Sequence, residues 1–230
     1  MEILAIIPAR GGSKGIPFKN IIKIEKKPLL YYTVNAALKS KLITRTIVST
    51  DNEKISKIAK FYGSEVIKRP KKLSDDKIGL EPAINHVLDS LNKKENYVPD
   101  LIIILQNTSP LRNSRHIDEA LKLLIKNKFD SVLSGFSYYS FLWNYKKNDS
   151  VKSVSYDPKK RPNHQNMKEQ LYENGALFAS TLSAFKKSNC RISGKIGFYK
   201  MPIELSYNID TLEDLKDVKR MMKLLKNDFF

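Results

Sequence analysis

The sequence predicts an α/β fold in which helices cover both faces of a mostly parallel sheet. Short, continuously apolar runs alternate along the chain with longer segments whose apolar residues recur at helical spacing. A glycine-rich turn follows the first apolar run directly, and the chain has no internal repeats and no low-complexity linker. This alternation is typical of βαβ units, whose parallel strands are joined through helices. The length of 230 residues fits one domain, 1–230.

Strands and helices are expected in strict alternation up to residue 133. The strands are expected at 3–8, 46–49, 65–67, 101–105 and 130–133, each a short apolar or β-branched run. Four amphipathic patterns between them predict helices, of which the first has Pro28 in its first turn. Thr50 and Glu53 have the spacing of a capping box for the second helix.

The alternation breaks at about residues 136–172. Aromatic residues come first, followed by a polar stretch without a clear period. We expect an inserted arm here, and because its aromatic cluster at 138–145 is too apolar for a solvated lid, we expect it to pack against a second subunit. Regular structure is expected to resume at 175–178, and a terminal helix is expected to carry Leu215, Val218, Met222 and Leu225.

The composition excludes several classes of protein. Lys and Arg number 41 against 24 Asp and Glu, a net charge of +17, but lysines are spread through every segment and no nucleic-acid recognition pattern is present. This distribution argues against nucleic-acid binding as the main role. The single cysteine, Cys190, excludes an internal disulfide, and the separated histidines exclude a zinc site of usual spacing. His86 and His116 are interpreted as helix-surface residues. No apolar run approaches the roughly 18 residues of a membrane span, so we expect a soluble, cytoplasmic protein.

The strongest local signal is residues 8–20, PARGGSKGIPFKN, directly after the first strand. The spacing matches neither a P-loop nor a dinucleotide fingerprint. Its glycines nonetheless allow backbone amides to approach phosphate oxygens, and Arg10, Lys14 and Lys19 supply cations. The segment predicts a phosphate-binding loop, and the alternative is a glycine-rich turn with solvated lysines.

This segment resembles the N-terminal signature of the acylneuraminate cytidylyltransferases, the CMP-sialic acid synthetases. Four later stretches resemble the same family in order, at residues 49–51, 105–112, 173–176 and 209–215, so that the resemblance covers the chain from end to end. It implies a Rossmann-like nucleotide-binding sheet, a homodimer, and Mg²⁺ as the cofactor. It also implies the reaction: the anomeric hydroxyl of an acidic nine-carbon sugar attacks the α-phosphorus of CTP and releases pyrophosphate.

The resemblance also assigns roles to individual residues. Arg10, Lys19 and Asp210 would be catalytic, and Arg69 would contact the cytosine, the alternative for Arg69 being a surface arginine before Pro70. The nucleotide-binding set is Arg10, Gly11, Gly12, Ser13, Lys19, Asn20 and Arg69. The sugar-binding set is Gln106, Arg161, Gln165 and Asn174. The alternatives are a polar loop start for Gln106, a purely structural role for Arg161 and Gln165, and an Asn-Gly turn for Asn174.

The metal site is expected at Asp210 and Asn208. Family members have Asp-Ile-Asp where this chain has Asn208-Ile209-Asp210, so the site loses one negative charge. Asp210 also directly precedes the last helix and is a candidate N-cap. Where some sialic acid enzymes place an arginine facing the sugar carboxylate, this chain has Tyr172-Glu173.

The second departure leaves the sugar open among N-acetylneuraminic, legionaminic, pseudaminic and 3-deoxy-octulosonic acids. A non-catalytic sugar-nucleotide-binding protein and a polyanion-binding protein are the alternatives from other classes.

Overall fold

Six of the seven strands in the main sheet run parallel to one another. The computed structural model describes residues 1–13, 15–75 and 78–225. Within these residues the spatial order is β11 (Ile196–Lys200), β7 (Ser131–Tyr138), β10 (Gln170–Thr181), β6 (Leu101–Leu105), β1 (Ile3–Pro8), β4 (Arg45–Thr50) and β5 (Glu65–Lys68). Strand β10 is antiparallel to both of its neighbours, and the remaining pairs are parallel. The prediction of a mostly parallel sheet is confirmed.

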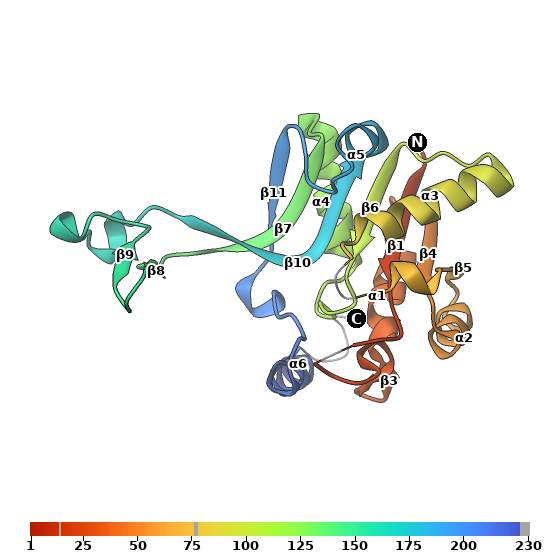
Figure 1. Ribbon diagram of the computed structural model, residues 1–230, viewed down its shortest axis with the longest axis horizontal. Helices are drawn as coiled ribbons and strands as arrows, with labels where there is room; N and C mark the ends of the chain where they lie inside the picture. Colours follow the sequence, from red (N-terminus) through yellow and green to blue (C-terminus); the bar gives the residue numbers. More distant parts are fainter. Residues whose placement is uncertain (14, 76–77, 226–230) are drawn as a thin grey trace.

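Helices cover both faces of this sheet (Figure 1). One face packs against α1 (Leu29–Leu38), α2 (Glu53–Phe61) and α4 (Ser114–Asn127), and the other against α3 (Glu81–Glu95) and α5 (Leu182–Ser188). Alternate residues of β1 serve the two faces: Ile3 and Ile7 enter the first core, and Leu4 and Ile6 enter the second. The continuous apolar run of β1 thus reflects burial on both sides, and the three-layer α/β/α sandwich is confirmed.

A third apolar cluster lies at the sheet end where the site is expected. Helix α6 (Leu212–Leu224) packs there through Leu215, Val218 and Met222 against Ile16 and Leu29. A small hairpin of β2 (Lys23–Ile24) and β3 (Lys27–Pro28) completes this region. This packing brings the segment before α6 next to the loop after β1. The short 3₁₀ helices are η1 (Lys19–Ile21), η2 (Lys71–Leu73), η3 (Pro158–Lys160), η4 (His164–Asn166) and η5 (Ile203–Leu205).

The arm projects away from the sheet as an extension of β7 and β10 (Figure 1). The two strands stay paired out to Tyr138 and Gln170, and the tip holds β8 (Trp143–Tyr145), β9 (Val151–Ser153), η3 and η4. Tyr145 is 85% exposed and Trp143 is 44% exposed. Packing of this arm on a second subunit, and the division into one domain with an arm, stay predictions.

Several local expectations are wrong. Asn52, not Thr50, caps α2, because its side chain accepts hydrogen bonds from the amides of Lys54 and Ile55 while Thr50 is still in β4. Thr211, not Asp210, caps α6.

His116 is buried rather than on the helix surface, and its Nδ1 accepts the Asn113 amide in the capping box of α4. Strands β7 and β10 extend well beyond the expected 130–133 and 175–178, because the arm is built from them. Among the described residues, no helix is long and apolar enough to cross a bilayer.

Candidate active site

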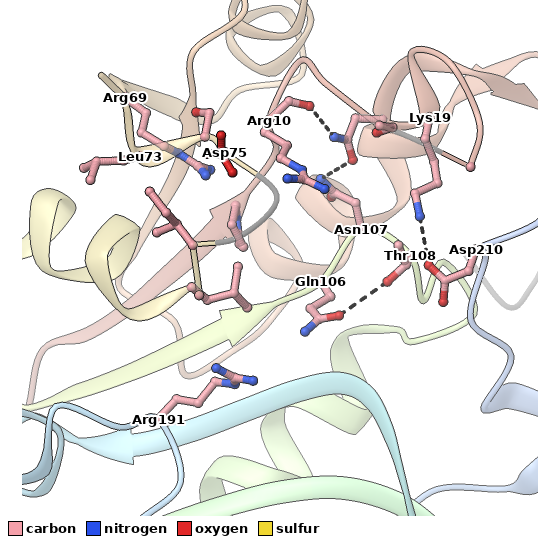
Figure 2. Close-up of a pocket in the computed structure, with 18 residues that line it drawn as sticks. Arg10, Lys19, Arg69, Leu73, Asp75, Gln106, Asn107, Thr108, Arg191 and Asp210 are labelled. Carbon is pink, nitrogen blue, oxygen red and sulfur yellow. Dashed lines mark hydrogen bonds and ion pairs between the residues drawn. The ribbon is translucent and has the colours of Figure 1, made fainter. Parts of the chain in front are cut away.

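A pocket of about 680 Å³ opens at the carboxyl ends of the parallel strands (Figure 2). This is the edge at which open α/β sheets bind ligands. Loops after β1, β5 and β6 contribute to it, together with η1 and the segment before α6. The described lining residues are Pro8, Arg10, Ser13, Gly15, Lys19, Asn20, Arg69, Leu73, Ser74, Asp75, Ile78, Gly79, Leu80, Gln106, Asn107, Thr108, Arg191 and Asp210.

The loop after β1 is held from two sides. The amide of Gly11 donates to Asp51 Oδ1 at 2.8 Å, which gives the 49–51 motif a structural role. Asn20 Nδ2 donates to the Arg10 carbonyl at 2.8 Å, and Asn107 Nδ2 donates to Asn20 Oδ1 at 3.2 Å. These bonds present Arg10 to the pocket on a fixed backbone.

The glycines of this loop lie differently with respect to the pocket. Gly11 and Gly12 lie outside the lining residues, so phosphate binding by their amides stays a prediction. Gly15 does line the pocket, and a Cβ there would lie 2.5 Å from the carbonyl oxygen of Asp210, so no larger residue fits. Lys14 lies outside the described residues.

Lys19 connects the phosphate loop to the segment before α6. Its Nζ donates to the Ile209 carbonyl at 2.8 Å and to Asp210 Oδ1 at 3.0 Å. The Lys19 side chain is 14% exposed and that of Asp210 is 65% exposed. A cation and a carboxylate, far apart in sequence, therefore meet at the pocket.

Arg69 is a buried arginine of the pocket, so the alternative of a surface arginine is wrong. Its Nε donates to Ser49 Oγ at 3.2 Å and its Nη2 donates to the Ser49 carbonyl at 2.6 Å. Burial lowers the pKa of this guanidinium from its usual value. Leu73 and Leu80 line the same pocket. A charged fork beside apolar side chains suits a planar polar ring.

Asp210 retains an exposed carboxylate because Thr211 and Asp214 cap α6 in its place. Asn208 Nδ2 donates to Asp210 Oδ2 at 3.2 Å, and Asn208 Oδ1 is buried without a hydrogen-bond partner among the described residues. Two backbone amides, of Asp210 and Thr211, donate to Asp214 and lower the pKa of its carboxyl. The oxygen atoms at 208 and 210 are hard ligands of the kind that Mg²⁺ prefers.

These oxygens do not make a complete cation site. Within the described ranges, no group of three or more His, Cys, Asp or Glu side chains could hold a metal ion. A cation held here would therefore need most of its ligands from another source.

The predicted sugar-binding residues separate into three places. Gln106 lines the pocket, where Thr108 Oγ1 donates to its Oε1 at 3.5 Å. Asn174 lies outside the lining residues and is buried. Its Oδ1 accepts from Ser134 Oγ and the Ala176 amide, and its Nδ2 donates to Ser206 Oγ and Met201 Sδ.

Asn174 thus supports the turn at Gly175, whose φ is +66°. Arg161 and Gln165 lie on the arm, outside the pocket lining, and the Arg161 guanidinium stacks on Phe141 at 4.0 Å from the ring centroid.

Sequence reasoning missed Arg191 and residues 73–75 and 78–80 as parts of the pocket. Arg191 lines it from the loop between α5 and β11. No motif surrounds this residue, and only the tertiary fold brings it to the carboxyl ends of the strands.

A nucleotide-sized pocket at this sheet edge, lined by fixed cations and by the carboxylates of Asp75 and Asp210, defines a nucleotidyltransferase-like site. Comparison with known proteins is more specific: the model of the cytidylyltransferase family matches residues 4–229, and the chain belongs to this family.

Two relatives of the chain carry different names. It is 35% identical over 211 residues to N-acylneuraminate cytidylyltransferase B of Danio rerio, covering 90% of this chain and 48% of the relative. It is 30% identical over 227 residues to the pseudaminic acid cytidylyltransferase of Campylobacter jejuni strain 81-176, covering 97% of both. The chain spans about half the length of the first of these relatives.

A solved structure, the CMP:2-keto-3-deoxy-manno-octonic acid synthetase complexed with CTP, shares the fold. Its TM-score is 0.70 at 16% identity, covering 98% of this chain and 100% of that one.

Proposed function

We propose that this chain transfers CMP from CTP to an acidic nonulosonic sugar and releases pyrophosphate. The observation that carries the proposal is the gathering of Arg10, Lys19, Arg69 and Gln106 around one pocket. Cations beside a glycine-containing loop suit a nucleoside triphosphate. The names of the relatives, N-acylneuraminate and pseudaminic acid cytidylyltransferases, support an acidic sugar as the second substrate.

The proposed reaction is an in-line displacement at phosphorus. The anomeric hydroxyl oxygen forms a bond to the α-phosphorus, and the bond from that phosphorus to the oxygen bridging it to the β-phosphorus breaks. The electron pair leaves with pyrophosphate, and the hydroxyl proton passes to solvent. Arg10 and Lys19 neutralise charge that develops on the phosphate oxygens, and no covalent intermediate on the protein is required.

The nucleotide would occupy the pocket with its base near Arg69. This guanidinium is fixed by Ser49, and Leu73 and Leu80 provide apolar surface for the ring. Asn20 and Ser13 would support the triphosphate. The hydrogen bond from Asn20 to the Arg10 carbonyl favours a positioning role for Asn20.

We propose Mg²⁺ as the cofactor, held by Asp210, with the Asn208 oxygen near it and nucleotide phosphates completing its ligands. When bound, the ion would supply positive charge to the phosphates. Asp210 is paired with Lys19, so triphosphate binding, which attracts Lys19, would release the carboxylate for the metal.

On the sugar side we propose that Gln106 contacts the sugar directly. Arg161 and Gln165 lie outside the lining of the pocket in their own chain. They would therefore reach a sugar only in the pocket of a second copy of the chain. This supports a homodimer in which the exposed aromatic side chains of the arm tip are covered. We place the reaction in the cytoplasm, where CTP is available.

The experiment that tests the proposal is pyrophosphate release with CTP, Mg²⁺ and a panel of acidic sugars. The panel contains N-acetylneuraminic, legionaminic, pseudaminic and 3-deoxy-octulosonic acids. Release with one or more of these acids supports the enzyme. CTP binding without release under any of these conditions overturns the proposal in favour of a non-catalytic binding protein, and steeply salt-dependent DNA binding alone favours polyanion binding.

A further inference from the structure

Arg191 is a cation of the pocket that the proposed chemistry leaves without a role. Among the described lining residues four are cations, and Arg10, Lys19 and Arg69 are assigned to the nucleotide. Arg191 enters from the side of β10, across the pocket from the loop that carries Arg10 (Figure 2). Its side chain is 26% exposed.

The Arg191 side chain is held in place before any ligand arrives. Its guanidinium carbon lies 4.9 Å from the ring centroid of Phe178, which is buried. The loop is fixed on both sides of it: Asn85 Nδ2 donates to Asn189 Oδ1 at 2.7 Å, and the Ser193 amide donates to Ser131 Oγ at 3.0 Å. A charged group fixed in this way binds a ligand with little loss of side-chain entropy.

Among the residues that the structure describes, none accepts a hydrogen bond from the Nε–Nη2 edge of the Arg191 guanidinium. Nη1 donates to Glu81 Oε1 at 2.5 Å, and the buried Nε has no hydrogen-bond partner among the described residues. Arg45 is a useful contrast. Its Nη1 also pairs with a carboxylate, of Glu95, and its Nε and Nη2 together bind both oxygens of Glu65, at 2.8 and 2.6 Å. Among the described residues, Arg191 has a carboxylate partner for Nη1 but no carboxylate on its Nε and Nη2.

We infer that Arg191 binds the carboxylate of the acidic sugar through its Nε–Nη2 edge, in the way that Arg45 binds Glu65. This rests on the proposed function and names the group that selects an acid over a neutral sugar. The planar fork of arginine matches a carboxylate. A carboxylate fits better than a phosphate here, because Arg10 and Lys19 lie across the pocket, and Gln106 also lines the pocket to contact the same sugar.

The test compares Arg191→Gln with wild type for KM of the sugar, KM of CTP, and preference for the acid over its carboxamide analogue. Loss of a charged hydrogen-bonded pair predicts a rise of roughly 10- to 100-fold in the sugar KM, with the CTP KM little changed. The preference for the acid should fall by a similar factor. Arg191→Lys, which keeps the charge and loses the fork, should lie between the two. Arg220→Gln removes an exposed arginine paired with Asp217 and controls for the change in net charge.

Glu81→Gln separates this role from a merely structural ion pair. If Arg191 only anchors α3, both variants lower the melting temperature and shift the sugar KM in the same direction. If Arg191 binds the sugar, Glu81→Gln leaves the sugar KM unchanged or lowers it, because a competing carboxylate is gone, whereas Arg191→Gln raises it.

A folded Arg191→Gln protein with a wild-type sugar KM, or with a raised CTP KM instead, overturns the inference. If wild type shows no turnover, that result counts against the proposed function alone. Calorimetric titration of wild type and Arg191→Gln with N-acetylneuraminic and pseudaminic acids then tests the inference by binding, without catalysis. The inference is supported if wild type binds one of these acids in that measurement and Arg191→Gln does not. Equal binding by the two proteins, or none by either, overturns it.

Discussion

Replacing Lys19 by Met removes a charge from the pocket while keeping most of the aliphatic side chain. In the structure Lys19 makes one hydrogen bond to a backbone carbonyl and one ion pair with the exposed Asp210. The ion pair with so exposed a carboxylate stabilises the fold by at most about 1 kcal/mol, and the charged hydrogen bond by roughly 1.5–2 kcal/mol. The melting temperature should therefore fall by about 5–10 °C.

At 25 °C the Lys19→Met variant should remain folded, so its loss of stability does not explain a large loss of activity. A donor aimed at charge developing on a phosphate is worth roughly 10²–10³-fold in kcat/KM. The assay is pyrophosphate release at 25 °C, with unfolding followed by circular dichroism. Lys122→Met, on the exposed face of α4, controls for the loss of one charge. A folded Lys19→Met enzyme within a few-fold of wild-type kcat/KM would refute the role given to Lys19.

Three further predictions address the metal, a buried histidine and the arm. Asp210→Asn should abolish transfer yet leave α6 intact, because Thr211 caps that helix. Calorimetry should find that Mg²⁺ binds wild type weakly without CTP and more strongly with it, and that Asn208→Asp tightens this binding. Mg²⁺-dependent activity retained in Asp210→Asn would move the metal site elsewhere. Burial lowers the pKa of His116 to about 4, so between pH 6.5 and 4 the unfolded chain binds a proton that the folded chain does not, and the free energy of unfolding decreases by up to about 3 kcal/mol as the pH is lowered. His116→Gln keeps an acceptor for the capping box, so urea unfolding at pH 7 and pH 4.5 should show a smaller decrease for this variant than for wild type. An equal decrease in the two proteins would contradict this. Replacing Trp143 and Tyr145 by Ser should convert a dimer into a monomer in sedimentation velocity, and a wild-type monomer at micromolar concentration would contradict the docking role of the arm.

The main features of the fold could be predicted because burial on both faces leaves a direct mark on a strand. The run Leu101–Leu105 is continuously apolar since helices cover both sides of it, and its position between amphipathic segments identifies the sheet. The full lengths of β7 and β10 could not be predicted, because beyond the sheet these strands are stabilised by pairing with each other. The caps at Asn52 and Thr211 were misplaced by one or two residues, since neighbouring polar side chains compete for the same amides.

The site could be predicted where one loop carries the chemistry, and not where tertiary packing assembles it. Arg10 and Lys19 share a segment with a clear composition, and Gln106 follows the central strand. Asn174 matches a family motif, but its side chain is used in hydrogen bonds inside the protein. Arg191 stands in a short loop without neighbouring motifs, and only the packing of α5 against β10 and the pairing of β11 with β7 direct it into the pocket.

In the proposed reaction, the bond that breaks lies between the α- and β-phosphorus atoms of CTP. This cleavage is tested most directly with two samples of CTP, labelled at the α- or the γ-phosphorus and incubated with the protein, Mg²⁺ and the preferred acidic sugar. We expect the α label to appear in a sugar-linked CMP and the γ label in pyrophosphate, in equal amounts. Release of the γ label as inorganic phosphate, or no transfer of the α label with any acid of the panel, would contradict it.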